Sequence, residues 1–343
     1  MFGLESGARI RHTPQMLKIE HLSLSIPASD GDRPAVSDVS LSLVPGRVLG
    51  LVGESGCGKT LTAQAVLRLG DAQGIARTAG KVLLDDRDIF TMPEAELRKV
   101  RGGRVSMIFQ EPMTALNPVF TIGDQLTEVI RLHLGLSRAE AVTRATKLLA
   151  DVGMQDGAAL LAQFPDALSG GMRQRVLIAM AMAADPDYII ADEPTTALDV
   201  SVQKRIIDLL RRLQEKRGMG MLLVTHDFGL VAELCDEVAV MYAGHIVERG
   251  PVADIFNHPS HPYTRALMHC RPEAGGRKQR LPAIAGQVPA PGMWPAGCRF
   301  AARCPLADAA CEAPVQEAAW QAGKHSARWV HVEKVEEALE AFV

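Results

Sequence analysis

The chain has 343 residues and a mass of 37.0 kDa, more than one compact domain usually uses, so we expect two domains or one large domain with an appendage. Hydrophobic residues make up 47% of the chain and charged residues 22%, which excludes a disordered or fibrous protein. The net charge of −3 gives no overall attraction for nucleic acid or anionic lipid, so we expect no nucleic-acid partner.

The pattern predicts no segment that crosses a membrane, because no apolar run approaches the roughly 18 residues that a spanning helix needs. Residues 1–15 carry charges without an apolar core, which is unlike a secretory signal, so we expect a cytoplasmic chain. Residues 1–16 are expected to be a flexible lead or the product of an over-long start. Six cysteines in such a chain favour metal or redox chemistry over a disulfide framework.

In chain order, alternating apolar and polar residues predict an antiparallel strand pair at 17–26 and 36–43. Further predicted strands are 48–52, 81–84, 105–109, 188–191 and 221–225, and predicted helices include 60–69 and, between 122 and 161, the capped segment 139–151. This alternation of strand and helix is typical of a mostly parallel sheet covered on both faces, hence an α/β fold. Prolines crowd 251–315, which places a domain boundary near 250, before a Glu-rich helical tail near 332.

A phosphate-binding loop stands between the strand at 48–52 and the helix that follows it. The loop matches G-x-x-x-x-G-K-[ST] with Gly53, Glu54, Ser55, Gly56, Cys57, Gly58, Lys59 and Thr60. Its glycines let backbone N–H groups point at phosphate oxygens, and the helix N-terminus adds partial positive charge. Lys59 is expected to reach the β- and γ-phosphates of ATP, and the Thr60 hydroxyl to ligate Mg²⁺.

An acidic pair ends the apolar strand at 188–191. Taken alone this is usually a plain strand end, but together with the loop at 53–60 it indicates the second half of a nucleotide site. Asp192 is expected to hold Mg²⁺, and Glu193 is the candidate general base for the attacking water.

The segment Leu168-Ser169-Gly170-Gly171-Met172 resembles the LSGGQ signature of ABC transporter ATPases, with Met172 as a departure at its fifth position. The resemblance implies an ABC-type P-loop ATPase with a RecA-like core, an antiparallel β subdomain and a helical subdomain. In that family two copies stack head to tail, so that Ser169, Gly170 and Gly171 of one copy contact the γ-phosphate held by the other.

Three more motifs resemble the same family. Gln110 is similar to the Q-loop glutamine, which implies a contact with the γ-phosphate and Mg²⁺. Asp199 ends a segment similar to the D-loop, and His226 is similar to the switch histidine. The implied domains are an ATPase domain at 17–255, with its helical subdomain at about 111–167, and an extension at 256–343.

Two positions near the loop raise separate questions. Where the family usually has an aromatic residue that stacks on adenine, this chain has Arg33, so either the guanidinium stacks on adenine or the base is loosely held. Beside Lys59 and a helix N-terminus, the pKa of the Cys57 thiol is expected to fall, although phosphoryl transfer does not need a thiol.

The segment 258–267 and the segment 110–118 resemble those of the ATPase subunits of oligopeptide and dipeptide importers. The resemblance implies a second ATPase subunit, identical or paralogous, two transmembrane permease subunits and an extracytoplasmic substrate-binding protein. It places the chain at the cytoplasmic face of the membrane, as a peripheral subunit that energises peptide import. Permease contact is expected near 110–165, where Met113, Leu116 and Phe120 either line a docking groove or pack in the core.

Cys298, Cys304 and Cys311 resemble the cysteine cluster of that extension, which in several relatives holds a [4Fe–4S] cluster. Such a cluster normally has four thiolates, and no cysteine follows Cys311. Either Cys270, His325 or His331 replaces the fourth ligand, or the cysteines are buried packing around Trp294 and Phe300.

Other interpretations keep the same ATPase core. Nickel, opine and glutathione importers use the same kind of motor, and some ABC ATPases act in DNA repair, in translation or as accessory scaffold subunits. The repair and translation proteins usually have long insertions, fused tandem domains or a basic face, and this sequence shows none of these. The catalytic positions are intact, so the sequence predicts an active ATPase.

Overall fold

The computed structural model describes residues 16–110, 115–196, 198–270, 284–315, 318–320 and 325–329. Within them a small antiparallel sheet has the order β2-β1-β4-β5. Its strands are β1 (Leu17–Ile26), β2 (Arg33–Leu43), β4 (Ala76–Leu84) and β5 (Arg87–Asp88). The predicted hairpin is therefore confirmed, and its second strand begins earlier than expected because Arg33 and Pro34 pair with Ile26 and Ser25.

A second, larger sheet in the described chain has the order β11-β12-β10-β9-β3-β8-β7-β6. Its strands are β3 (Val48–Val52), β6 (Val105–Ile108), β7 (Tyr188–Asp192), β8 (Gly220–Thr225), β9 (Glu237–Tyr242), β10 (His245–Pro251), β11 (Ala318–Trp320) and β12 (His325–Ala327). Five neighbouring strands are parallel to one another, namely β9, β3, β8, β7 and β6. On the other side of β9 the sheet continues with β10, β12 and β11, each antiparallel to its neighbour. The α/β class expected from the alternation of elements is confirmed.

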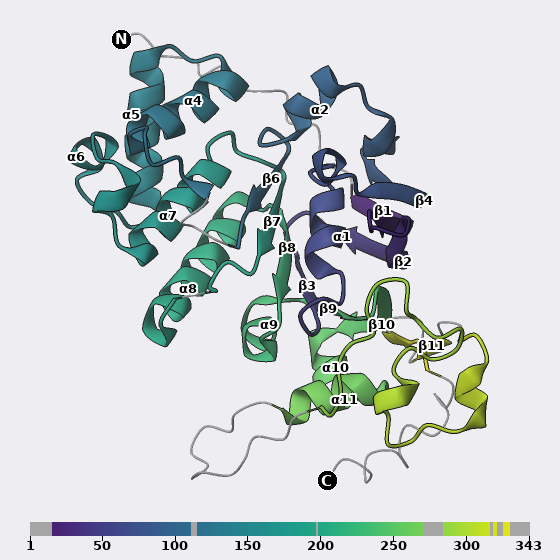
Figure 1. Cartoon of the computed structure of the whole chain (residues 1–343). Helices are drawn as coiled ribbons and strands as arrows, with labels where there is room; N and C mark the ends of the chain where they lie inside the picture. Colours follow the sequence, from purple (N-terminus) through teal and green to yellow (C-terminus); the bar gives the residue numbers. More distant parts are fainter. Residues whose placement is uncertain are drawn as a thin grey trace.

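Both faces of this sheet are buried, which explains the uninterrupted apolar strands. In β7, Tyr188 and Ile190 join the core shared with the small sheet, whereas Ile189 and Ala191 join the core under the helices. Helix α1 (Lys59–Ala65) contacts β2, β7 and β8, so it lies between the two sheets (Figure 1). It ends earlier than the predicted 60–69 helix, because Arg68 has φ 52 and Gly70 follows it.

The helices on the other side of the sheet include the predicted capped one. They are α4 (Ile122–Leu134), α5 (Arg138–Asp151), α6 (Gly157–Leu161), α7 (Gly170–Ala181), α8 (Val200–Arg217) and α9 (Phe228–Leu234), and α2 (Glu94–Val100) lies apart beside the small sheet. Ser137 and Glu140 form the predicted capping box at the start of α5. Leu116 is buried in this core, so of its two alternatives core packing holds and the docking groove does not, whereas Phe120 is 51% exposed. Met113 lies outside the described residues.

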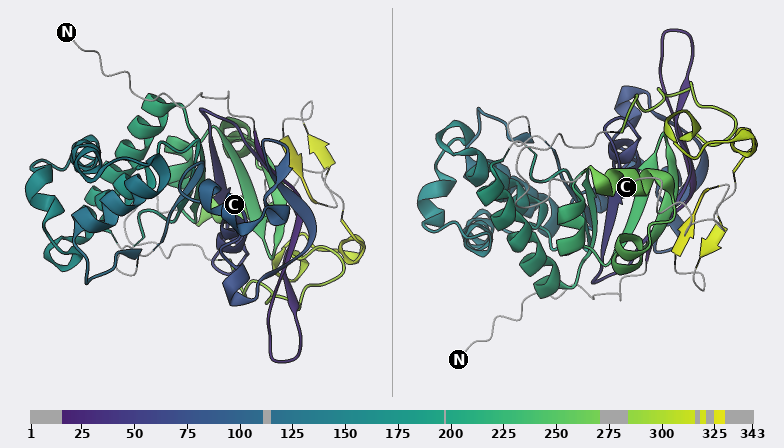
Figure 2. Two further views of the ribbon diagram at one scale, coloured as in Figure 1. Left: turned by 90° about the horizontal axis from the view of Figure 1, so that it is seen from above. Right: turned by 90° about the horizontal axis from the view of Figure 1, so that it is seen from below.

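The extension adds α10 (Val252–Asn257), α11 (Pro262–His269) and strands β11 and β12 to the molecule. Because β12 pairs with β10, the large sheet continues across the expected boundary near 250. The part of the extension from residue 284 onward, drawn in yellow, and the helices α4 to α6 lie at opposite ends of the molecule in all views (Figure 2). No helix in the described ranges is both long and apolar enough to cross a membrane, and the tail near 332 lies outside them.

Candidate active site

The loop at 53–60 joins β3 to α1 and has a backbone that only glycine fits at two places. Gly53 has φ 154, and a Cβ there would lie 2.2 Å from the Met241 carbonyl oxygen. Gly58 has φ 106, and a Cβ there would lie 2.8 Å from the Met241 side chain. The glycines therefore let the loop lie directly against β9, with Ser55 and Gly56 exposed at its tip.

Lys59 is folded back onto this loop. Its ammonium group donates hydrogen bonds to the carbonyl oxygens of Gly53, at 2.8 Å, and Glu54, at 2.9 Å, and the side chain is buried. These contacts fix a positive charge inside the loop. Together with the start of α1, this cradle has the donors that a polyphosphate requires.

Cys57 contradicts the expectation of a reactive thiol. Its side chain is fully buried, and its sulfur lies 3.8 Å from the Lys59 nitrogen. Burial raises the pKa of the Cys57 thiol, and the nearby ammonium of Lys59 only partly offsets this effect. The prediction of a lowered pKa was therefore wrong, because the helix and loop that supply positive charge also exclude water.

Thr60 and Asp192 meet at the start of α1. The Thr60 hydroxyl donates to a carboxylate oxygen of Asp192 at 3.2 Å. Burial raises the pKa of Asp192 to about 6, with a smaller contribution from the neighbouring charge of Glu193. A desolvated carboxylate beside a hydroxyl is a hard oxygen donor set, so these residues fit the predicted Mg²⁺.

Glu193 is the point where three loops converge. One of its carboxylate oxygens accepts hydrogen bonds from the Gln110 amide at 3.2 Å and the Thr196 hydroxyl at 2.7 Å, and the other lies 3.4 Å from His226 Nδ1. Gln110, Glu193 and His226 follow the neighbouring parallel strands β6, β7 and β8, whose carboxyl ends share one sheet edge. Glu193 itself has φ 45, a strained conformation that is typical of functional sites.

Thr196 was not among the predicted site residues. Its hydroxyl donates to the carboxylate of Glu193, three residues earlier in the chain. The turn after β7 brings the two side chains together. The signal in the sequence was its place in the D-loop segment, where Asp199 was singled out instead.

The signature and D-loop residues lie at helix starts. Ser169 caps α7 by accepting from the Met172 N–H at 3.4 Å, and Asp199 caps α8 by accepting from the Val202 N–H at 3.0 Å. Gly170 is exposed and Gly171 is half-buried, and a Cβ at Gly171 would lie 3.0 Å from Val202. The start of α7 thus presents free backbone N–H groups beside the start of α8.

Arg33 does not have a free guanidinium. It donates to both carboxylate oxygens of Asp30, at 3.2 and 2.7 Å, and its aliphatic carbons lie beside Gly292 of the extension. The alternatives for adenine at this position are stacking on a guanidinium held by Asp30 or loose binding.

The extension reaches the cradle itself. The Tyr263 hydroxyl accepts from the Glu54 N–H at 2.8 Å, and Arg303 donates two hydrogen bonds to the Glu54 carboxylate at 2.7 and 2.9 Å. These bonds raise the pKa of Arg303 above its ordinary value. Sequence reasoning missed both residues, because each lies more than 200 positions from Glu54.

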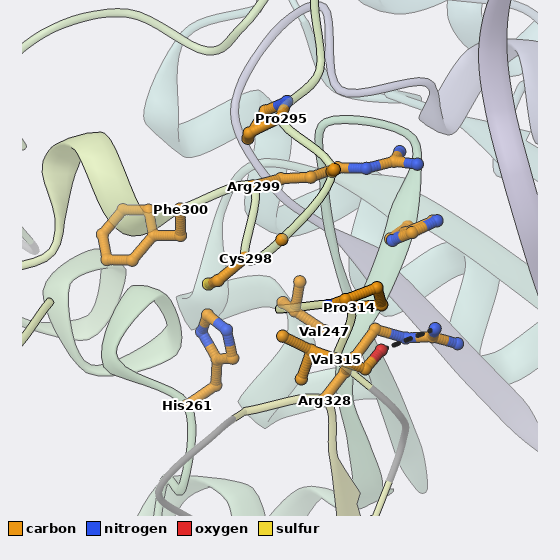
Figure 3. A pocket seen from close by; sticks show the side chains of 12 residues that line it. Val247, His261, Pro295, Cys298, Arg299, Phe300, Pro314, Val315 and Arg328 are labelled. Carbon is orange, nitrogen blue, oxygen red and sulfur yellow. Dashed lines mark hydrogen bonds between the residues drawn. The ribbon is translucent and has the colours of Figure 1, made fainter. Parts of the chain in front are cut away.

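The predicted iron–sulfur ligands lie in one apolar core, where Cys298 and Cys311 are buried and Cys304 packs against them. Cys298 lines a pocket of about 220 Å³ together with His261 and Arg328 (Figure 3), whereas neither Cys304 nor Cys311 lines it. Burial raises the pKa of the Cys298 and Cys304 thiols, the latter to about 11.

The proposed replacements for a fourth thiolate do not complete such a site. His325 is buried with its Nε2 2.7 Å from a Glu248 carboxylate oxygen, and His331 lies outside the described residues. No group of three His, Cys, Asp or Glu side chains able to hold a metal occurs in the described part of the chain, Cys270 included. The described residues therefore do not fit a [4Fe–4S] cluster, whereas Cys298, Cys311 and Phe300 do share one apolar core with Trp294 at its edge.

Comparison with known proteins agrees with this geometry. Residues 36–196 match the family of ABC transporters, and residues 247–311 match the C-terminal region of oligopeptide/dipeptide transporters. A peptide import ATP-binding protein of Brucella abortus is 47% identical over 88% of this chain and 91% of its own length. The chain belongs to the ATP-binding subunits of the oligopeptide/dipeptide ABC transporter family.

A second curated relative and two solved structures are also similar to this ABC ATPase. The D,D-dipeptide transport ATP-binding protein DdpD of Escherichia coli is 47% identical over 88% of this chain and 92% of its own length. Among solved structures, the ATP-binding cassette MJ0796, a dimer bound to ADP and phosphate, is 26% identical with a TM-score of 0.61, over 69% of this chain and 98% of that one. The cassette cbiO1 of Clostridium perfringens is also 26% identical, with a TM-score of 0.60, over 70% of this chain and 90% of that one.

Proposed function

We propose that this ABC ATPase hydrolyses ATP to energise the import of dipeptides and oligopeptides across the cytoplasmic membrane. The observation that carries the ATPase assignment is the convergence of Gln110, Thr196 and His226 on Glu193, beside the Asp192–Thr60 pair. The peptide cargo is supported by the names of the relatives, which are peptide and dipeptide transport proteins.

Glu193 acts as the general base. It accepts a proton from water while the water oxygen bonds to the γ-phosphorus, and the bond from that phosphorus to the bridging oxygen breaks, leaving ADP and phosphate. Gln110 and Thr196 orient the Glu193 carboxylate by hydrogen bonds, and His226 lies within reach of its other oxygen. Thr60, Asp192 and Gln110 would hold Mg²⁺, which supplies charge neutralisation at the β- and γ-phosphates.

The binding residues divide into two half-sites. The loop from Gly53 to Thr60 holds the phosphates of one nucleotide, with Arg33 at the adenine end. Ser169, Gly170 and Gly171, supported by Asp199, serve the nucleotide of a second ATPase subunit in a head-to-tail dimer. The exposed start of α7 and the dimeric state of the MJ0796 cassette support this arrangement.

The permease subunits dock at the helical end of the molecule. Exposed apolar side chains gather in sequence around the Q-loop and the start of α4, including Phe109, Val119 and Phe120. We place the chain at the cytoplasmic face of the membrane as a peripheral subunit, with two permeases and an extracytoplasmic binding protein. Residues 17–255 form the ATPase domain with its helical subdomain at about 111–167, and 256–343 form the extension.

Reconstitution with the permease subunits encoded beside it tests this function. The tagged chain should co-purify with them, and vesicles should take up labelled dipeptide when ATP and the binding protein are supplied. Phe120→Ser should abolish co-purification and spare ATP hydrolysis. Leu132→Ser, which changes a more exposed apolar side chain at the far end of α4, should spare both. Uptake of nickel, an opine or glutathione in place of peptide would reassign the cargo, and failure to recover permeases would overturn the transport role.

The proposal includes no iron–sulfur cluster. The described residues contain no group of three side chains able to hold a metal, and His325 is already engaged by Glu248. ATP hydrolysis at Glu193 uses none of these residues.

A further inference from the structure

A carboxylate stands inside the loop that we assign to phosphate. Glu54 is the second residue of the cradle, and its carbonyl oxygen accepts a hydrogen bond from Lys59 at 2.9 Å. A negative side chain there repels the phosphates and competes with them for the charge of Lys59. A cation paired with the Glu54 carboxylate would remove this repulsion.

Arg303 of the extension supplies that charge. Its guanidinium makes two parallel hydrogen bonds to the Glu54 carboxylate, at 2.7 and 2.9 Å, and only 4% of its side chain is exposed. Such a bidentate pair is strong, and the burial of Arg303 reduces its screening by salt although 29% of the Glu54 side chain is exposed.

The rest of the guanidinium is held as well. It donates to the carbonyl oxygens of Ala285, at 2.8 Å, and Ile284, at 3.2 Å, and lies 5.7 Å from the centre of the Tyr242 ring. Arg303 is thus fixed by its own segment of the extension before it meets Glu54. These contacts fix the guanidinium on both sides of its pair with Glu54.

A second contact joins the extension to the backbone of the same residue. The Tyr263 hydroxyl accepts the Glu54 N–H at 2.8 Å, and Tyr263 is fully buried against Tyr242 and Phe300. Glu54 is therefore held at its side chain and its N–H by the extension, and at its carbonyl oxygen by Lys59. A shift of the extension moves the groups that fix Lys59.

We propose that Arg303 is a positioning residue of the nucleotide site, which neutralises Glu54 and holds the cradle in its phosphate-binding shape. The extension is then a working part of the ATP site. This inference rests on the proposed ATPase function and adds to it a source of nucleotide affinity outside the ATPase domain.

Equilibrium binding of a fluorescent ATP analogue tests the charge relation. Arg303→Gln should raise the Kd about tenfold, because it leaves an unpaired carboxylate beside the phosphates. Adding Glu54→Gln to that variant should return the Kd to within about threefold of wild type, since the repulsive charge is gone. A double variant as weak as the single one would overturn the proposal, because it would indicate general damage to the fold.

Arg328→Gln is the matched control. Arg328 also joins the extension to the ATPase domain, through an ion pair with Asp38 at 3.1 Å, but it does not contact the cradle. It should leave the Kd unchanged even if it lowers the melting temperature. Equal weakening by Arg328→Gln and Arg303→Gln would refute a specific role for Arg303.

Coupling between two sites is reciprocal, so ATP should also stabilise the extension. Amide exchange across 298–311 should slow when ATP is added to wild type, and the slowing should be lost in Arg303→Gln. No protection in wild type that binds ATP would overturn this inference alone. A wild-type chain that binds no ATP would instead overturn the proposed function.

Discussion

The cradle at 53–60 and the cysteine segment at 298–311 are both irregular segments with a spaced motif, yet they differ in what their spacing determines. In the cradle, Gly53, Gly58 and Lys59 shape the loop through contacts within a few residues and with one neighbouring strand. In the cysteine segment, a similarly regular spacing brings Cys298, Cys304 and Cys311 to one apolar core, yet no group of three side chains able to hold a metal forms among the described residues.

The difference lies in how the chemical groups are supplied. A phosphate cradle uses backbone N–H groups, which follow as soon as the local backbone is set. A metal cluster uses side chains, whose meeting depends on every element between them. Motifs of the first kind predict a site more securely than motifs of the second.

The largest expected effect tests the catalytic side of this comparison. Glu193→Gln should lower ATP turnover by about 10²- to 10⁴-fold, because it removes the general base, while ATP binding survives. Phosphate release measures ATP turnover, and the yield of ATP-bound dimers measures ATP binding. Undiminished turnover would exclude Glu193 as the base.

Gly53→Ala tests whether the cradle depends on local backbone geometry. The added Cβ would meet the Met241 carbonyl oxygen in a conformation that alanine rarely adopts, so we expect a loss of roughly 2–3 kcal/mol in unfolding free energy. Gly56→Ala is the comparison, because its positive φ is strained but its Cβ would meet nothing within 4 Å. Chemical denaturation should show the smaller loss for Gly56→Ala, and equal losses would argue against the close approach to β9.

Acid stability tests the core of the extension. Burial lowers the pKa of His261 to about 3, so below pH 6.5 the unfolded chain binds a proton that the folded chain refuses, and stability falls as the pH drops toward 3. His261→Asn keeps an acceptor for the Tyr263 N–H but does not titrate. In urea titrations, the free energy of unfolding of this variant should fall by roughly 1 kcal/mol less per pH unit than that of wild type. The fall that remains comes from other groups, such as His245. An unchanged slope would show that His261 does not contribute.

The smallest expected effect concerns the cysteines. Cys298→Ala should cost about 1 kcal/mol, as for a small buried side chain, and the same change at Cys235 in the ATPase domain should cost a similar amount. Protein purified without oxygen should contain less than one iron per chain, by iron and sulfide analysis with an absorption scan at about 400 nm. About four irons, lost on Cys298→Ala, would reverse this interpretation and show that a fourth ligand exists.

The two segments meet at one residue, which makes them less independent than their motifs suggest. Arg303 stands next to Cys304, and its partner Glu54 stands in the cradle. Packing of the cysteine core therefore bears on nucleotide binding even without a metal.

The sequence by itself determined the α/β class, the strand–loop–helix around Lys59 and the residues that end the parallel strands. These follow from periodicity and short spacing, since Gln110, Glu193 and His226 must share a sheet edge once their strands are parallel neighbours. Only the tertiary structure decided the rest. It raised the pKa of Cys57 by burial, placed Leu116 in the core, engaged His325 with Glu248 and joined Arg303 to Glu54. Burial and contacts between distant residues depend on how whole elements pack, and local patterns do not carry that information.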